Sequence, residues 1–78
     1  MRYNPIGEQL RAWRATRGLS QRALATAAGI GYVLVAKIET GAIADPRLST
    51  LRKLADALKL TVGELVDRSP TKRARGGR

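Results

Sequence analysis

The 78-residue sequence contains neither cysteine nor histidine, and it has only six acidic residues. Without thiols and imidazoles it cannot form a disulfide, a thiolate nucleophile or the metal sites that these side chains build, and it lacks the commonest general base. The six carboxylates fall on different predicted elements, and no two show the spacing of an acid–base pair or a metal site. We therefore expect no enzyme activity, no catalytic residue, no metal and no cofactor.

Long hydrophobic runs are also absent. No apolar stretch approaches the ~18 residues of a membrane span, and the N-terminus lacks the apolar core of a signal peptide. A chain of this length forms one small domain with a thin core. We expect a soluble, cytoplasmic protein that does not associate with membranes.

Positive charge is abundant and unevenly placed. The chain has 15 Lys and Arg residues, which give it a net charge of +9. Residues 68–78 contain no acidic residue and almost no apolar side chain, and their basic residues are Arg68, Lys72, Arg73, Arg75 and Arg78. Because such a segment cannot offset its ordering entropy by burial, we predict a disordered basic tail that contacts the backbone of a polyanion. An inert, solubilising tail is the alternative.

Helical spacing dominates the rest of the chain, and strand signals are weak. Asn4 is a candidate N-cap with Pro5 at the first helical position, and this helix should end near Gly18. Ser20 is the candidate N-cap of a second helix over residues 21–28, which Gly29 should end. Small residues on one side of that helix favour the close approach of another helix.

Three further helices are predicted after Gly29. The first runs from Ile30 to Gly41, and the second begins near Asp45–Pro46 with a stripe predicted to be buried: Leu48, Leu51, Leu54, Ala55 and Leu58. Thr61 and Glu64 have the spacing of a capping box, so a short fifth helix should follow and end near Asp67.

Three stretches of the chain, taken together, carry a family resemblance. They are L-R-A-W-R-A-T-R-G-L-S-Q-R-A-L-A-T-A-A-G-I, then K-I-E-T-G, then P-R-L-S-T-L-R-K-L-A-D-A-L. In this order the chain resembles the lambda-repressor and Cro-like helix-turn-helix family, also called the XRE family. The resemblance implies an all-α, five-helix domain over residues 5–67, with the helix-turn-helix at about residues 21–40 and its second helix in the DNA major groove.

The resemblance also implies roles for individual residues. The predicted base-reading residues are Gly31, Tyr32, Val33, Ala36 and Lys37. The predicted phosphate contacts are Gln21, Arg22, Leu34, Thr40 and Arg47. Arg14 and Glu39 match positions that form a structural ion pair in the family. Lys37 can donate to guanine, whereas Val33 and Ala36 can only meet thymine methyl groups, so direct readout should be sparse and partly apolar.

These observations predict a sequence-specific double-stranded DNA-binding protein that regulates transcription, as a repressor, at a bacterial or phage nucleoid. We expect a homodimer at least on DNA, with a candidate dimer surface made by Leu60, Val62, Leu65 and Val66. Two alternatives stay open. One is a protein-interaction module, an antitoxin or phage accessory factor whose third helix docks on a protein. The other is an architectural DNA binder without sequence preference.

Overall fold

The computed structural model describes residues 5–70, which form five helices: α1 (Ile6–Thr16), α2 (Gln21–Ala28), α3 (Tyr32–Thr40), α4 (Leu48–Leu58) and α5 (Val62–Asp67). No strand occurs in this range, so the all-α, five-helix prediction is confirmed. Residues 29–31 join α2 to α3, and the two helices meet at 120°. This angle and this short glycine-containing turn are typical of a helix-turn-helix.

Local signals position the ends of α2 and α5 as predicted. The Ser20 hydroxyl accepts a hydrogen bond from the Ala23 N–H at 2.9 Å, and Gly29 ends α2 in the left-handed conformation with φ 73°. The Thr61 N–H donates to the Glu64 carboxylate at 2.9 Å, and the Glu64 N–H donates to the Thr61 hydroxyl at 3.0 Å. The predicted capping box is therefore confirmed, and it closes the first turn of α5.

The predicted starts of three helices are wrong by a few residues at most. Pro5 is the N-cap of α1 with ψ 143°, not its first residue, and Asn4 lies outside the described residues. Helix α3 begins at Tyr32 instead of Ile30, with Gly31 as N-cap. Helix α4 begins at Leu48, with Arg47 as its extended N-cap at ψ 154°. Pro46 disfavours the helical conformation at Asp45, the residue before it, so the helix cannot begin there.

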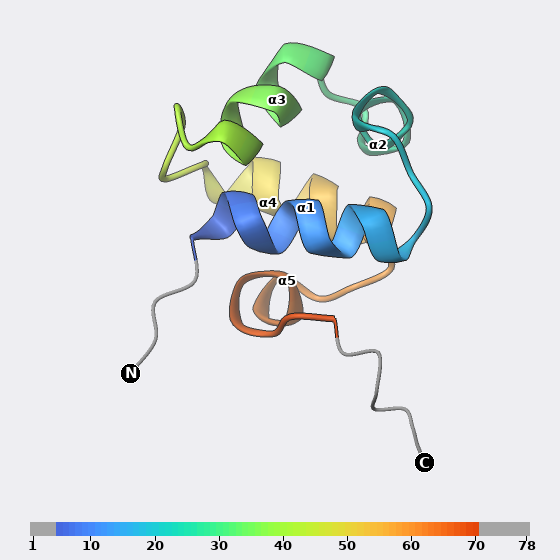
Figure 1. The fold of residues 1–78 in the computed structure, drawn as a ribbon, viewed down its shortest axis with the longest axis vertical. Helices are drawn as coiled ribbons and strands as arrows, with labels where there is room; N and C mark the ends of the chain where they lie inside the picture. The colour runs from blue at the N-terminus through green and yellow to red at the C-terminus, as the bar shows by residue number, and fades with distance from the viewer. Residues whose placement is uncertain (1–4, 71–78) are drawn as a thin grey trace.

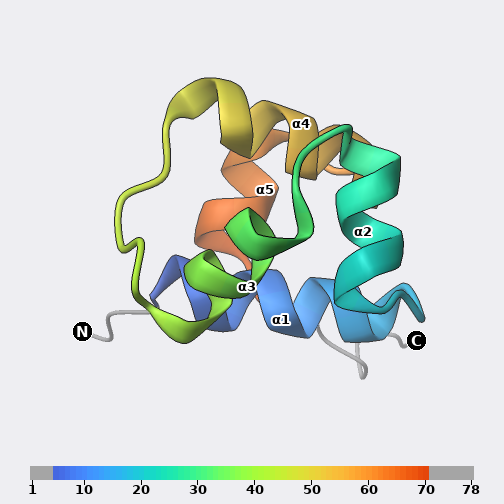
Figure 2. The same ribbon diagram turned by 90° about the horizontal axis from the view of Figure 1, so that it is seen from above.

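The helices are arranged around one core, to which each contributes. Helix α1 packs against α3 on one side and α5 on the other, while α4 contacts α2 and α5. In Figure 1, α2 and α3 therefore lie above α1 and α4, and α5 lies below them. The view from above in Figure 2 shows α3 crossing in front of α5. The buried apolar residues are Leu10, Leu24, Ala25, Val35, Ile38, Leu54, Ala55, Leu58 and Leu65.

Two leucines differ from their predicted environments. Leu48 is 55% exposed, so it does not belong to the buried stripe of α4, which begins with the half-buried Leu51. Leu65 is completely buried in the core. It therefore cannot lie on a dimer surface, and of the four residues predicted there only Leu60, Val62 and Val66, each half-buried, are accessible.

Within residues 5–70, no single helix has the length and apolar character needed to cross a membrane. Helices α2 and α3 have the length and apolar composition of a membrane span only when they are taken together, and they are bent by 120° at the turn between them.

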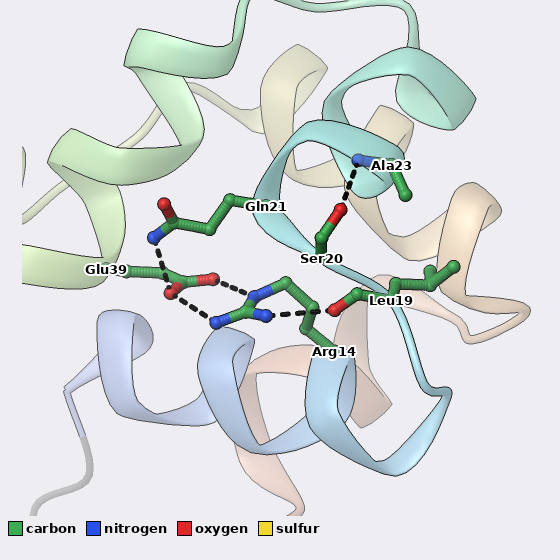
Figure 3. A network of polar contacts seen from close by, with 6 residues as sticks. All are labelled: Arg14, Leu19, Ser20, Gln21, Ala23 and Glu39. Carbon is green, nitrogen blue, oxygen red and sulfur yellow. Dashed lines mark hydrogen bonds and ion pairs between the residues drawn. The ribbon is translucent and has the colours of Figure 1, made fainter.

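A buried ion pair joins the helix-turn-helix to α1 (Figure 3). Arg14 Nε donates to Glu39 Oε2 at 2.7 Å, and Arg14 Nη2 donates to Glu39 Oε1 at 3.1 Å, so the predicted pair is present and bidentate. Arg14 Nη1 also donates to the Leu19 carbonyl, and Gln21 Nε2 donates to Glu39 Oε1. This network connects α1, the loop before α2, the start of α2 and the end of α3.

Residues 68–70 are ordered against α1, which corrects the predicted start of the disordered tail. The Arg68 carbonyl accepts hydrogen bonds from Gln9 Nε2 at 2.6 Å and from Trp13 Nε1 at 2.8 Å. The Ser69 hydroxyl donates to Gln9 Oε1 at 2.7 Å. These bonds satisfy the amide of Gln9, which is only 3% exposed and would otherwise be a costly buried polar group. Residues 71–78 of the predicted tail lie outside the described residues.

Gly7 allows α1 to approach the end of α3. A Cβ atom added at Gly7 would overlap the Ile38 carbonyl oxygen and lie 2.8 Å from the Glu39 carbonyl oxygen. Both obstacles are backbone atoms of α3, which cannot move aside as the end of a side chain can. Glycine is therefore required at this position for its lack of a side chain.

We expect Gly7→Ala to destabilise the protein by about 1–3 kcal/mol, because relieving the overlap must separate α1 from α3. Chemical denaturation followed by circular dichroism measures this change. Gly63→Ala is the matched control, since a Cβ there meets only the Thr61 hydroxyl at 3.9 Å. This control should be neutral or stabilising by up to about 1 kcal/mol. Equal midpoints for the two variants would show that α1 and α3 do not require this close approach.

We expect Arg14→Ala to cost about 3–5 kcal/mol, because it leaves the Glu39 carboxylate buried without its cation. The side chain of Glu39 is only 2% exposed. Arg11→Ala, which removes the same charge from an exposed position on the same helix, should change stability by less than about 0.5 kcal/mol. Urea denaturation compares the two variants, and similar midpoints would contradict a structural role for the ion pair.

Candidate nucleic-acid interface

The two sides of α3 differ in burial. Val35, Ile38 and Glu39 face the protein, whereas Val33 and Lys37 are exposed and Ala36 is half-buried between them. Since positions 33, 36, 37 and 40 follow helical spacing, their side chains share one face. The predicted base-reading residues therefore lie together on the outer face of α3, preceded by the exposed Gly31 and by Tyr32, which is 37% exposed.

Gln21 and Arg22 lie on the first turn of α2, and each contacts α3. The hydrogen bond from Gln21 Nε2 to Glu39, at 3.0 Å, fixes the Gln21 side chain beside the end of α3 (Figure 3). The Arg22 guanidinium carbon lies 4.3 Å from the centre of the Tyr32 ring. This distance is that of a cation–π contact, so Arg22 is held beside the start of α3.

Thr40 and Arg47 lie on either side of the loop that follows α3. The Thr40 hydroxyl donates to the Lys37 carbonyl at 3.2 Å and accepts from the Ala42 N–H at 3.4 Å. Arg47 is exposed at the N-cap of α4 and lines a hollow shared with Leu34 and Ser49. Both residues are accessible at the edge of the α3 face.

Leu34 does not fit the phosphate-contacting role predicted for it. Its side chain is half-buried against the core, and its backbone N–H donates to the Gly31 carbonyl at 3.2 Å. The structure therefore leaves no free donor at this position, and Leu34 is a packing residue at the edge of the interface.

The exposed surface of α2 and α3 is positively charged. Glu39 is the only acidic residue between positions 21 and 40, and it is buried and paired with Arg14. The hydrogen bond from Arg14 to Glu39 raises the pKa of Arg14 above its ordinary value, so the Arg14 guanidinium stays charged at neutral pH. Arg22 and Lys37 are consequently exposed cations without an exposed acid on the same two helices. Such a surface attracts phosphate groups.

Arg17, the C-cap of α1, has two structural contacts. It donates from Nε to the Leu58 carbonyl at 2.8 Å and lies over the Trp13 ring at 5.2 Å. Neither this contact nor that of Gln9 with residue 68 was predicted. The hydrogen bonds of Arg17 with Leu58 and of Gln9 with Arg68 each join residues more than 40 positions apart. Local sequence patterns cannot predict such contacts.

Among curated proteins, the chain is 44% identical over 55 residues to the HTH-type transcriptional repressor RghR of Bacillus subtilis, and the match covers 70% of this chain and 41% of that protein. It is 38% identical over 63 residues to the uncharacterized HTH-type transcriptional regulator RghRB of the same species, over 81% of this chain and 45% of that protein. The chain thus spans less than half the length of these two relatives.

Solved structures of bacterial and phage proteins share the fold. SinR, solved in complex with DNA, has a TM-score of 0.76 and 29% identity, over 80% of this chain and 98% of that one. The P22 c2 repressor, solved with a synthetic operator, has a TM-score of 0.73 and 26% identity, over 82% of this chain and 96% of that one. A family model described as a helix-turn-helix domain matches residues 5–68. The geometry and these matches agree, and the chain belongs to this helix-turn-helix family.

Proposed function

We propose that the chain binds double-stranded DNA in a sequence-specific manner and regulates transcription, with α3 in the major groove. The observation that carries this proposal is the exposed face of α3, on which Val33 and Lys37 project beside the cationic first turn of α2. A helix presented in this way by a helix-turn-helix fits the major groove, and the first helix of the motif then crosses the DNA backbone.

Base recognition is assigned to Gly31, Tyr32, Val33, Ala36 and Lys37. Lys37 is the strongest hydrogen-bond donor among them and can contact guanine O6 and N7. Val33 is 58% exposed, which suits an apolar contact with a thymine methyl group. Gly31 lacks a side chain, so it brings the backbone at the start of α3 close to the bases. With so few donors, DNA shape contributes part of the specificity.

Phosphate contacts are assigned to Gln21, Arg22, Thr40 and Arg47. Gln21 and Arg22 lie at the N-terminus of the eight-residue helix α2, where free N–H groups and the helix dipole favour an anion. Thr40 is the last residue of α3, and Arg47 follows the next loop as the N-cap of α4. Contacts at both ends would fix the register of α3 on the duplex without reading sequence.

A repressor role is proposed by analogy with RghR, which is named a transcriptional repressor, and with the P22 c2 repressor. A repressor of this kind acts by occupying its operator, in the cytoplasm or nucleoid, without enzymatic chemistry. We assign dimer formation on DNA to the half-buried apolar residues Leu60, Val62 and Val66. Two copies would bind half-sites about one DNA turn apart.

A protein-interaction function is the second candidate. SinR has also been solved in complex with the protein SinI, so a neighbour with this fold binds a protein. The exposed Val33 and Leu48 are the side chains that would favour such an interface.

We expect Lys37→Ala to weaken binding to a selected DNA site by about 1–3 kcal/mol and to change binding to random duplex little, because it removes a base-edge donor. Fluorescence anisotropy with both duplexes measures the two affinities after in-vitro selection of the site. Lys59→Asn is the control for charge: Lys59 follows α4 in the left-handed conformation, φ 63°, which asparagine tolerates. Equal losses on both duplexes for Lys37→Ala would contradict base reading, and failure to select any motif would contradict sequence specificity.

We expect truncation after Pro70 to flatten the salt dependence of DNA binding. The removed segment contains Lys72, Arg73, Arg75 and Arg78. For every DNA phosphate that the tail neutralises in the full chain, its removal should reduce the slope of log K against log salt by about 0.9. The melting temperature should not change, because Arg68 and Ser69 still bond to α1 in the shortened chain. An unchanged slope would mean that the tail does not touch DNA.

A further inference from the structure

Arg22 and Tyr32 form a contact that their separate assignments do not explain. Arg22 lies on the first turn of α2, while Tyr32 is the first residue of α3. The guanidinium carbon of Arg22 nevertheless lies 4.3 Å from the centre of the Tyr32 ring. The contact therefore joins the first turn of α2 to the first residue of α3, which directly follows the turn between the two helices.

The three neighbouring arginines differ in how their donors are used. Arg14 donates from Nε, Nη1 and Nη2 to protein acceptors, and Arg17 donates from Nε to a carbonyl. For Arg22, by contrast, no hydrogen bond or ion pair is found within residues 5–70. A guanidinium that stacks on a ring through one face keeps all of its N–H groups free at its edge, because these donors lie in the plane of the group.

We propose that Tyr32 is a positioning residue for phosphate recognition: its ring holds the Arg22 guanidinium between α2 and α3, with the donor edge free for a backbone phosphate. This inference rests on the proposed DNA-binding function and deepens it. Arg22 then acts as the phosphate ligand, and the ring of Tyr32 is occupied by Arg22 instead of by a base. This assignment replaces the base-reading role of Tyr32.

The physical advantage of the stack is preorganisation. A free arginine side chain populates many rotamers, and part of this conformational entropy is lost when it binds a phosphate. Stacking restricts the side chain before the duplex arrives, so less is lost on binding. Because Tyr32 belongs to α3, the stack also links the phosphate held by α2 to the position of the reading helix.

The two roles of Tyr32 predict different results. A positioning role affects every duplex equally, since phosphates are common to all sequences, whereas a base-reading role affects only the selected site. We expect Tyr32→Leu to lower affinity about 2–5-fold on both selected and random duplex, the equivalent of an exposed cation–π contact. Tyr32→Phe, which keeps the ring, should restore binding.

A double-mutant cycle with Arg22→Ala tests the coupling. Arg22→Ala should reduce the slope of log K against log salt by about 0.9, and adding Tyr32→Leu to it should weaken binding little further. Additive effects would overturn the proposal, as would a Tyr32→Leu effect confined to the selected site. Each variant is also melted without DNA, because a merely structural role would lower the melting temperature and leave the salt slope unchanged.

The design distinguishes failure of this inference from failure of the proposed function. Lys37→Ala reports on base reading independently of the stack, and Lys59→Asn controls for the removal of one positive charge. If Lys37→Ala weakens binding to the selected site only, but Arg22→Ala and Tyr32→Leu have additive effects, the positioning role of Tyr32 is overturned and the proposed function stands. Absence of any duplex binding overturns both. The stack itself is tested in the free protein by NMR, since the Tyr32 ring should shift the Arg22 δ-protons upfield and Tyr32→Leu should abolish that shift.

Discussion

The bidentate pair between Arg14 and Glu39 is the interaction on which the remaining structure depends. It connects α1 to the end of α3, while further hydrogen bonds of the same groups reach the Leu19 carbonyl and the Gln21 amide. A carboxylate this deeply buried is tolerated only when its charge and its lone pairs are matched. The pair therefore fixes α1, α2 and α3 relative to one another, with Glu39 at the centre.

The pair lies beside the closest contact of the two backbones it joins. The Glu39 carbonyl lies near Gly7, where any side chain would prevent the approach of α1. Close packing and buried polar contacts thus act on the same end of α3. Because this end is held from the protein side, the outer side of α3 can present Val33 and Lys37 to a groove without further support.

The described chain ends on the opposite side of α1 from this surface. Arg68 and Ser69 bond to side chains of α1, and in Figure 1 the end of α5 lies below α1 whereas α3 lies above it. The relatives are more than twice as long as their matched regions. In this chain, whatever follows Pro70 starts from the face away from the proposed DNA surface.

Helix ends that depend on short-range hydrogen bonds could be predicted from the amino-acid sequence. Ser20, Gly29 and the Thr61–Glu64 box act on backbone groups within a few residues of themselves, so their effects are readable without a fold. The Arg14–Glu39 pair and the assignment of α3 as the helix that enters the DNA groove were implied only by the family resemblance. The sequence contains no local signal that Arg47 is extended, so the start of α4 at Leu48 could not be predicted from it.

The packing of the helices determines which side chains are covered and which distant residues come into contact. Leu48 and Leu65 are both leucines on helices, yet Leu48 is 55% exposed and Leu65 is fully buried, because burial depends on the neighbouring helices. The contact of Arg22 with Tyr32 likewise exists only because the turn at residues 29–31 sets α2 and α3 at 120°. The spacing of apolar residues in the sequence shows which face of a helix is apolar, whereas the packing of the helices determines which residues that face contacts.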